Sequence, residues 1–189
     1  MYFPRSVLAL AACTATAATA LLTACATTPL PLQAVVQLRA TPPASPDANA
    51  PITGELHFKQ WQNDVLITGQ VEHLPPRGKM ALQGNALHIQ TAEDCSAPDA
   101  TGSIFNPTHK QHSYPGAGMA GDLPMLVPNE QGTATVNYLS AQVKLDGPDS
   151  VIGKTVVVHR DIDDWAIQPD GHAGPAIACG VIRAVTPSR

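Results

Sequence analysis

Two short runs of alternating apolar and polar residues, joined by a tight turn, constrain the fold of this chain more than any other feature. Leu56 and Phe58 alternate with polar neighbours before the turn, and Val65 and Ile67 alternate with other side chains after it. A period of two residues is typical of a half-buried β-strand, and the Gln62-Asn63-Asp64 turn makes the two runs a hairpin. No stretch of the sequence combines a sustained helical period with start and stop signals. The sequence therefore predicts an all-β protein.

Five further segments have the composition of short strands: residues 34–38, 86–90, 133–139, 155–159 and 177–184. Between them lie loops that draw on the 14 Gly and 18 Pro of the chain. Short strands separated by such loops are typical of an antiparallel sandwich or barrel. Residues 91–130 are the longest stretch for which we predict no strand. An irregular segment of that length is either functional or held in place by other means.

Charge and composition exclude some classes of function. The chain of 189 residues suggests one domain. Its 11 Lys and Arg residues form no basic stripe, and the formal net charge is -4, so no nucleic acid partner is expected. Aromatic residues make up only 4% of the chain, which is too few for a platform that stacks bases.

Residues 1–24 have the pattern of a secretory signal peptide. Arg5 supplies a positive charge, and residues 6–22 are uncharged and rich in Ala, Thr and Leu. The sequence LTAC, which ends at Cys25, matches the bacterial lipobox, so we expect cleavage before Cys25 and lipid attachment to its side chain. Residues 25–33 would then be a lipid-anchored linker on the periplasmic side of a bacterial membrane. A plain signal peptide cleaved at a nearby Ala is the alternative.

This interpretation assigns the four cysteines of the chain. Cys13 is removed with the signal peptide, and Cys25 carries the lipid. Cys95 and Cys179 remain as an even pair in an oxidising compartment, where a disulfide is expected. Loop entropy gives such a bridge a value of about 4 kcal/mol before strain. The spacing of the pair is unlike that of any zinc module.

Four segments resemble the Cu/Zn superoxide dismutase family. Residues 105–126, FNPTHKQHSYPGAGMAGDLPML, resemble the zinc loop of that family. The other three agree with it in order and spacing: LHIQTAEDC at 87–95, VIGKTVVVHRDIDD at 151–164 and HAGPAIACGVI at 172–182. Together they extend the resemblance over residues 34–185, which we predict to be the dismutase-like domain.

The resemblance implies a fold and a disulfide. The family folds as an eight-stranded antiparallel Greek-key barrel with long zinc-type and electrostatic-type loops, in agreement with the strand pattern of this chain. The family's internal disulfide corresponds to Cys95 and Cys179. A homodimer would also be consistent with the family, although nothing in the sequence decides it. The sequence names no protein partner.

The resemblance also assigns metal-ligand positions. In this family, copper is held by four His, one of which bridges to zinc, and zinc is completed by two more His and an Asp. His88 and His159 fall on copper positions, and His112 and Asp122 fall on zinc positions. Asp163 matches the carboxylate that orients ligands of both metals. Four of the seven ligand positions are therefore retained, two for each metal.

The other functional positions of the family are replaced. Gln90 stands where a second copper His is expected, and Ile104 stands at the bridging His. Met119 replaces a zinc His, and Ala176 replaces the Arg that guides superoxide. Ile104 has no donor atom, so its presence removes the shared ligand from both metals. We expect Met119 to fill space in company with Ile104, although a thioether would suit copper(I).

A second alignment of the strand around His88 is open. Residues 77–85 are longer than the usual turn of the family at this place. Gln83 and Asn85 could then match the paired His, which would leave copper only His159. The spacing from Gln90 to Cys95 favours the first alignment. Both alignments leave fewer ligands than the family pattern.

These losses predict a protein without normal dismutase activity. Two His make a weak copper site, and one His with one Asp falls two short of the usual four ligands of structural zinc. We therefore expect copper and zinc to bind weakly or not at all, and the module to act in binding or structure. The alternative is a metal-binding oxidoreductase: a dismutase with a reduced ligand set, or a copper-binding protein using His88, His159 and Met119.

Two loop histidines could substitute for missing ligands. His109 lies three residues before His112, and His172 lies in the loop before the ACGVI segment, near the mouth of the family's substrate channel. We expect both to be solvated surface residues.

Overall fold

The computed structural model describes residues 32–41, 50–75, 84–97 and 99–185. The described residues contain nine strands: β1 (Gln33–Ala40), β2 (Thr53–Trp61), β3 (Asp64–Glu72), β4 (Asn85–Gln90), β5 (Asp122–Leu126), β6 (Ala134–Ser140), β7 (Thr155–His159), β8 (Ala176–Val181) and β9 (Arg183–Val185). Within these ranges, no helix has the length and hydrophobicity needed to cross a bilayer. The predicted signal peptide and Cys25 lie outside the described residues.

The predicted hairpin is present as β2 and β3. Phe58 pairs with Ile67, and Trp61 pairs with Asp64 next to the turn. The Gln60 side chain stabilises this turn, because its Nε2 donates to the carbonyl oxygens of Gln62 at 2.8 Å and Asp64 at 3.0 Å. The alternation of the sequence thus corresponds to one buried and one exposed face.

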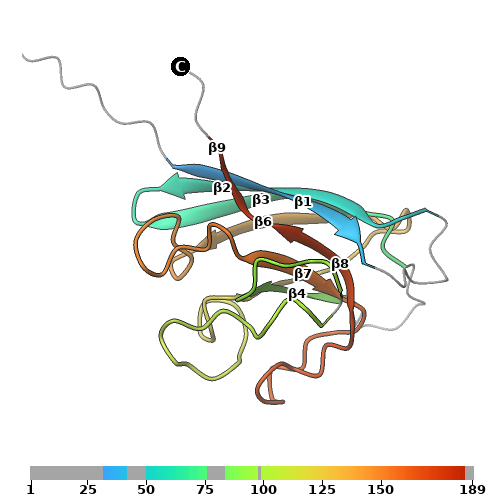
Figure 1. Ribbon diagram of the computed structural model, residues 1–189. Helices are drawn as coiled ribbons and strands as arrows, with labels where there is room; N and C mark the ends of the chain where they lie inside the picture. The colour runs from blue at the N-terminus through green and yellow to red at the C-terminus, as the bar shows by residue number, and fades with distance from the viewer. Residues whose placement is uncertain (1–31, 42–49, 76–83, 98, 186–189) are drawn as a thin grey trace, which may run out of the picture.

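The strands form a nearly closed antiparallel barrel (Figure 1). Their order is β5-β4-β7-β8-β1-β2-β3-β6, with β9 added beside β1. The pairings β3 with β6, β4 with β7 and β8 with β1 join strands that are not consecutive in the chain, which is the Greek-key pattern. Figure 1 shows β1, β2, β3 and β6 in one layer above β8, β7 and β4. The predicted all-β barrel is confirmed.

Buried aliphatic and aromatic side chains fill the barrel. Val36, Leu56 and Phe58 come from one wall and Leu87 and Val156 from the other, and all five are fully buried in a single cluster. Burying each side chain of this size contributes about 1.5–3 kcal/mol relative to exposure. This packing stabilises the sheet on which the polar site is built.

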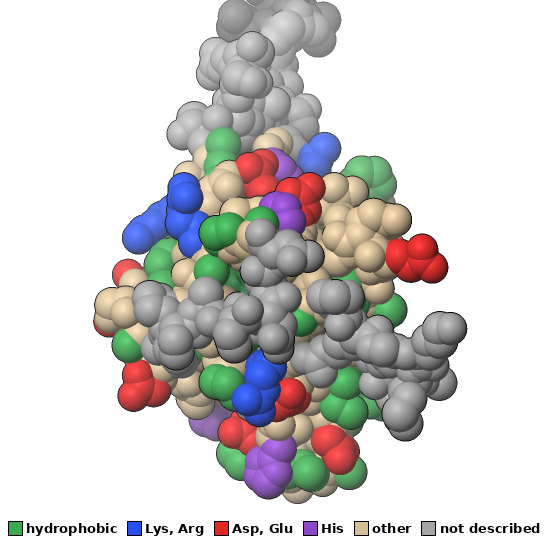
Figure 2. Space-filling model, turned by 90° about the vertical axis from the view of Figure 1, so that its right-hand side faces the viewer, with side chains coloured by type: hydrophobic (Ala, Val, Ile, Leu, Met, Phe, Trp, Pro, Cys, Tyr) green, Lys and Arg blue, Asp and Glu red, His purple; other side chains and the backbone are tan. Residues whose placement is uncertain are grey.

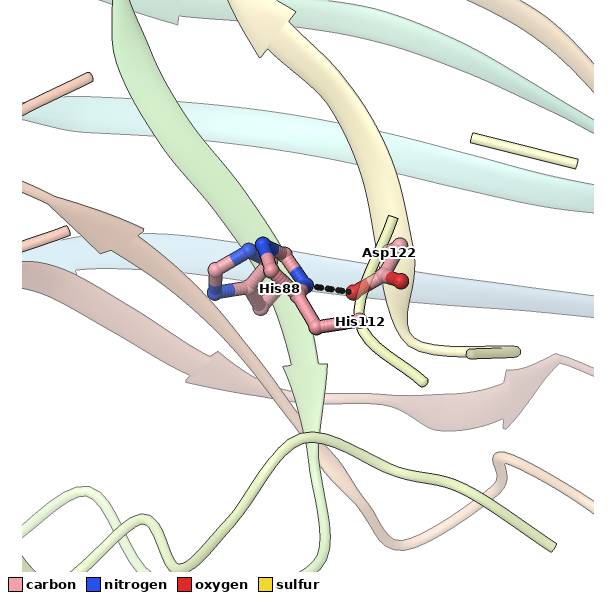
Figure 3. A group of neighbouring side chains, drawn as sticks. All are labelled: His88, His112 and Asp122. Carbon is pink, nitrogen blue, oxygen red and sulfur yellow. Dashed lines mark hydrogen bonds and ion pairs between the residues drawn. The ribbon is translucent and has the colours of Figure 1, made fainter. Parts of the chain in front are cut away.

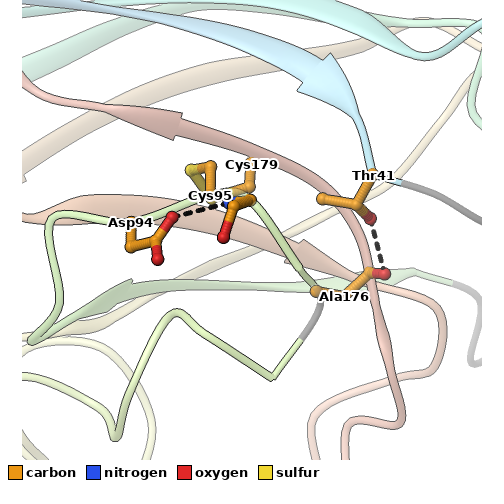
Figure 4. Close-up of a disulfide and its surroundings, with 6 residues drawn as sticks. Thr41, Asp94, Cys95, Ala176 and Cys179 are labelled. Carbon is orange, nitrogen blue, oxygen red and sulfur yellow. Dashed lines mark hydrogen bonds between the residues drawn. A yellow bond between two sulfur atoms is a disulfide. The ribbon is translucent and has the colours of Figure 1, made fainter.

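β1 connects the two ends of the barrel. At its start, Gln33 pairs with Val185 of β9, and at its end Ala40 pairs with Ala178 of β8. Just beyond β1, the hydroxyl of Thr41 donates to the carbonyl oxygen of Ala176 at 2.8 Å (Figure 4). The end of β1 is therefore fixed to the first residue of β8.

The predicted disulfide joins Cys95 to Cys179 (Figure 4). The two Cα atoms are 5.8 Å apart and the residues are separated by 84 positions. Cys179 lies in β8, whereas Cys95 lies in the long loop after β4. The bridge thus attaches this loop to the barrel, and beside it Oδ1 of Asp94 accepts a bond from the backbone N–H of Ser96 at 2.7 Å.

Two features of the strand prediction were wrong. The segment 91–130 is not irregular throughout, because it contains β5 at the end of the strand order. Pro124 obscured this strand, and proline is tolerated there because β5 is an edge strand. The predicted strand 177–184 is divided between β8 and β9 at Ile182, whose backbone exchanges hydrogen bonds with Gly153 and Lys154.

Candidate metal centre

Three adjacent strands position the candidate ligands. His88 lies in β4, where it pairs with Asp122 of β5 on one side and with Val157 of β7 on the other. His159 ends β7 and pairs with Ala176 of β8. The sheet therefore brings together residues that are distant in the sequence.

The zinc-type residues His112 and Asp122 bond directly to each other. Nδ1 of His112 lies 2.9 Å from Oδ1 of Asp122 (Figure 3). The second carboxylate oxygen accepts the backbone N–H groups of Ser113 at 3.1 Å and Met119 at 2.7 Å. Both side chains are fully buried, so these three contacts satisfy a carboxylate that water does not reach.

Asp163 links the zinc-type and copper-type residues. Its Oδ2 accepts a hydrogen bond from Nε2 of His88 at 2.9 Å, and its Oδ1 is in ion-pair contact with Nε2 of His112 at 2.9 Å. Burial alone would raise the pKa of Asp163, but the hydrogen bond and charge of His88, with smaller contributions from His112, bring it below its usual value. The structure thus places Asp163 in contact with both His88 and His112.

The backbone around His112 is held by a second loop. Gln168 accepts the N–H of His112 at 2.9 Å and donates to its carbonyl oxygen at 2.7 Å. In the same loop, Gly171 has a φ of 68°. A Cβ atom at Gly171 would lie 2.1 Å from Oδ1 of Asp163 and 2.7 Å from Nε2 of His112, so only glycine fits there. Sequence reasoning missed both residues, because neither occupies a ligand position.

The copper-type residues are His88 and His159, and Gln90 lies beside His159. Nδ1 of His159 donates to the carbonyl oxygen of Gly174 at 2.9 Å, and its Nε2 lies 3.3 Å from Nε2 of Gln90. The first contact leaves a lone pair on Nε2 of His159, which accepts from the Gln90 amide. The ring centroids of His88 and His159 are 5.1 Å apart.

Two buried acceptor atoms of this group have no partner in the described residues. They are Nδ1 of His88 and Oε1 of Gln90. In the neutral tautomer of His88 that donates from Nε2 to Asp163, Nδ1 would carry a lone pair. Burial, with a smaller contribution from His88, lowers the pKa of His159 from 6.5 to about 4, against the opposing hydrogen bond to Gly174. His159 is therefore neutral at pH 7.

Ile104 and Met119, which the resemblance places at ligand positions of the family, lie near the candidate ligands. Ile104 is buried and forms an isolated β-bridge with Gln90. Ile104 and Met119 line the same cavity as His88 and His159. No Lys or Arg appears among the described residues that line this cavity, which has a volume of about 940 Å³.

The two possible alignments place different residues beside His159. His88 and Gln90, the pair of the first alignment, both lie beside His159. Asn85 instead donates to the carbonyl oxygens of His159 at 2.8 Å and Arg160 at 3.0 Å, and Gln83 lies outside the described residues. The side-chain amide of Asn85 is therefore used in hydrogen bonds to the backbone.

The retained residues differ in how free their donor atoms are to bind a metal. Ligand atoms of His88, His112 and Asp122 all lie within 4.8 Å of one another (Figure 3), although the sequence divided these residues between two metals. Nδ1 of His112 and Oδ1 of Asp122 already contact each other. The unpartnered Nδ1 of His88, in contrast, is a free imidazole donor of the kind that copper and zinc bind.

The structure is an antiparallel Greek-key barrel with an internal disulfide and a cluster of buried histidine and aspartate side chains. These features define a class of protein, the β-barrel with a candidate metal site. The model of the family copper/zinc superoxide dismutase (SODC) matches residues 52–182. The chain is 34% identical over 145 residues to the extracellular superoxide dismutase [Cu-Zn] of Brugia pahangi, covering 71% of this chain and 70% of that protein. It is also 34% identical over 142 residues to superoxide dismutase [Cu-Zn] 2 of Brassica juncea, covering 69% and 89%.

A solved structure agrees with these sequence matches. The crystal structure of the clock protein EA4 superposes with a TM-score of 0.69 at 30% identity, covering 84% of this chain and 98% of that one. This chain belongs to the copper/zinc superoxide dismutase family. Copper and zinc are the metals of that family, and the described residues contain a possible partial metal site in His88, His112 and Asp122.

Proposed function

We propose that this protein is a lipid-anchored member of the family that lacks normal dismutase activity and serves as a binding or structural module on the periplasmic membrane face. The observation that carries the proposal is the buried Ile104 at the position of the bridging ligand. An isoleucine side chain offers no lone pair to either metal. The loss therefore affects both halves of the site at once.

The contacts of the zinc-type half support the proposal. His112 and Asp122 bond to each other, and Asp122 accepts two further backbone N–H groups. A zinc ion would have to displace these bonds and would still find only two of the usual four protein ligands. Met119 supplies a backbone N–H to Asp122 but no imidazole. Weak or absent zinc binding follows.

The copper-type half is weakened in a different way. The amide of Gln90 donates to the lone pair of His159 that a metal would use. Ala176 supplies no charge to attract superoxide, and the charged side chains of the described cavity lining are Asp99 and Asp170, which repel anions. Both coordination and substrate attraction are therefore poorer than in the family pattern.

A second candidate function is supported by the free Nδ1 of His88. A lone imidazole donor beside His159 and Met119 suits a copper-binding protein or a dismutase with a reduced ligand set. The two candidates differ in whether bound metal turns over superoxide.

One experiment separates the candidates. The purified mature protein is loaded with copper and zinc and dialysed, and metal content and superoxide decay are then measured. We expect metal below one equivalent and decay no faster than background. Stoichiometric copper with fast superoxide removal would overturn the proposal and favour the second candidate.

Restoring the ligands tests whether the scaffold is competent. The triple variant Gln90→His, Ile104→His and Met119→His should retain both metals after dialysis. Ser103→His is the matched control, because it adds an imidazole to the cavity lining outside the ligand positions. Equal metal retention in the control variant would show that the positions themselves do not matter.

A further inference from the structure

Two aspartates of the chain are followed directly by glycine: Asp146 precedes Gly147, and Asp170 precedes Gly171. Glycine has no Cβ atom to shield its backbone nitrogen, so the side-chain carboxyl group of the preceding aspartate can approach that nitrogen closely. Exposure alone does not select a reactive aspartate, because Figure 2 shows acidic side chains at several separate places on one face of the molecule. The contacts around each Asp-Gly pair therefore decide whether its two groups can react.

The two Asp-Gly pairs are alike in exposure and in glycine conformation. Asp146 and Asp170 are both exposed. Gly147, between β6 and β7, has a φ of 73°, and Gly171, between β7 and β8, has a φ of 68°. The pairs therefore form a natural comparison in which mainly the surroundings differ.

The Asp170–Gly171 pair is held by its surroundings. The backbone N–H of Gly171 donates to the carbonyl oxygen of Ile167 at 3.1 Å, and Oδ1 of Asp170 accepts the N–H of His172 at 3.3 Å. Gly171 is buried, and a Cβ atom there would lie 2.1 Å from Oδ1 of Asp163. Both groups that would have to react are thus hydrogen-bonded, and the glycine has no free space beside it.

The Asp146–Gly147 pair has none of these constraints. Gly147 is exposed, and a Cβ atom there would meet no atom of a non-adjacent residue within 4 Å. No described residue accepts a hydrogen bond from the N–H of Gly147 or donates one to the carboxylate of Asp146. The carbonyl oxygen of Gly147 accepts the N–H of Ser150 at 3.2 Å, which leaves the nitrogen available to the neighbouring carboxyl group.

We propose that Asp146 is a site of spontaneous isoaspartate formation in the folded protein, and that its contacts protect Asp170 from the same reaction. The backbone nitrogen of Gly147 attacks Cγ of Asp146 and forms a C–N bond. One carboxyl oxygen leaves as water, together with the amide proton and a proton from solvent, and a cyclic succinimide results.

Water then opens the succinimide and returns the proton to solvent. Breaking the new C–N bond restores aspartate, whereas breaking the bond to the original backbone carbonyl leaves the chain running through Cβ and Cγ, which is isoaspartate. The net reaction is an isomerisation that needs only water. The inference does not rest on the proposed function.

The altered backbone stays within a closed turn. Lys144 and Ser150 flank the site in an isolated parallel bridge, and the N–H of Val151 donates to the carbonyl oxygen of Lys144 at 2.9 Å. Leu145 and Val151 are buried on either side. The extra backbone atom therefore lengthens only the exposed tip of the turn and leaves the core packing unchanged.

The test compares the two sites in the folded protein and in the same chain unfolded in guanidinium chloride with its disulfide reduced. Samples are incubated near neutral pH for several weeks and digested. Peptide mapping detects isoaspartate by its resistance to endoproteinase Asp-N, and succinimide by the loss of one water. In the folded protein, Asp146 should isomerise at least about tenfold faster than Asp170, because cyclisation at Asp170 first requires a hydrogen-bonded turn to open.

In the unfolded chain these contacts are lost, so the two rates should lie within about threefold of each other. Equal rates at the two sites of the folded protein would overturn the proposal. The same difference in the folded and unfolded chain would also overturn it, because the difference would then come from the local sequence alone.

Two variants assign the modification to one residue. Asp146→Glu keeps the charge but would have to close a larger ring, which forms far more slowly, so isoaspartate from this turn should fall to background. Asp149→Glu is the matched control, because Asp149 is exposed in the same turn but is followed by Ser150. It should leave the yield at Asp146 unchanged. Equal yields of isoaspartate from this turn in both variants would overturn the assignment to Asp146.

The modified protein tests whether the change stays within the turn. Protein with isoaspartate at position 146 is separated from the unmodified form by chromatography, and both are unfolded in urea. We expect the two midpoints to coincide, because the extra atom lies outside the core. A lower midpoint for the modified form would contradict its confinement to the exposed turn.

Discussion

Nδ1 of His112 lies 2.9 Å from Oδ1 of Asp122, so two residues at zinc positions of the family are hydrogen-bonded to each other. This contact explains how a buried carboxylate and a buried imidazole can persist in the fold with few metal ligands around them. The stability of the metal-free fold should therefore depend on this pair.

Replacing Asp122 with Ala should destabilise the metal-free protein by about 3–5 kcal/mol, because the change leaves a buried imidazole and two backbone N–H groups without their acceptor. Urea unfolding measures the effect. Asp94→Ala is the control, since Asp94 is exposed and accepts one N–H, from Ser96; its cost should stay below about 1 kcal/mol. Equal midpoints for Asp122→Ala and the wild type would contradict a stabilising network.

Gln168 should fix its own loop to the loop that contains His112, and this contact does not require a metal. Its amide makes two hydrogen bonds to the backbone of His112. Gln168→Ala should therefore raise the rate of amide hydrogen exchange at His112 by about tenfold, as expected for the loss of roughly 1–2 kcal/mol of local stability. Gln142→Ala provides the comparison, because Gln142 accepts only from the side chain of Lys110. If both variants exchange alike, Gln168 does not fix the loop.

Acid should destabilise the metal-free protein through His159. Its pKa is about 4 in the folded state, below the usual 6.5, so the unfolded chain binds this proton first as pH falls. Stability is present above pH 6.5 and is lost as pH falls toward 4, by about 3 kcal/mol in total. Urea unfolding between pH 7 and 4 measures this slope.

The variant His159→Gln lacks the titrating group and should flatten the slope in this window. An unchanged slope in the variant would assign the pH dependence to other groups.

The disulfide should contribute about 4 kcal/mol to stability, since it closes a loop with a residue separation of 84. The double variant Cys95→Ser and Cys179→Ser should lower the free energy of unfolding by this order. Treating the wild type with a reductant should reproduce the loss, whereas the reductant should not affect the double variant. A reductant-sensitive double variant would point to another cause.

The sequence was sufficient for the parts of the fold that depend on local patterns. Alternation predicted the β2–β3 hairpin, and the cysteine pair predicted the bridge. β5 was missed because Pro124 and Met125 interrupt its alternation, and only pairing with β4 makes it a strand. Nonlocal pairing of this kind is not encoded in a short window.

The candidate site was predictable in its membership but not in its contacts. The family resemblance assigned His88, His112 and Asp122 to ligand positions. It could not show that His112 and Asp122 bond to each other, nor that Gln168 holds the backbone of His112. Such contacts depend on how separate loops pack, and spacing within one segment carries no information about them.

The course of β1 has a consequence for how a tethered molecule is oriented. Gln33 lies at the β9 end of the barrel, and Ala40 lies beside β8, where Ala176 pairs with His159. A strand of eight residues spans about 26 Å. If the predicted lipid on Cys25 is present, it would hold the barrel from the end of β1 that is farther from His159.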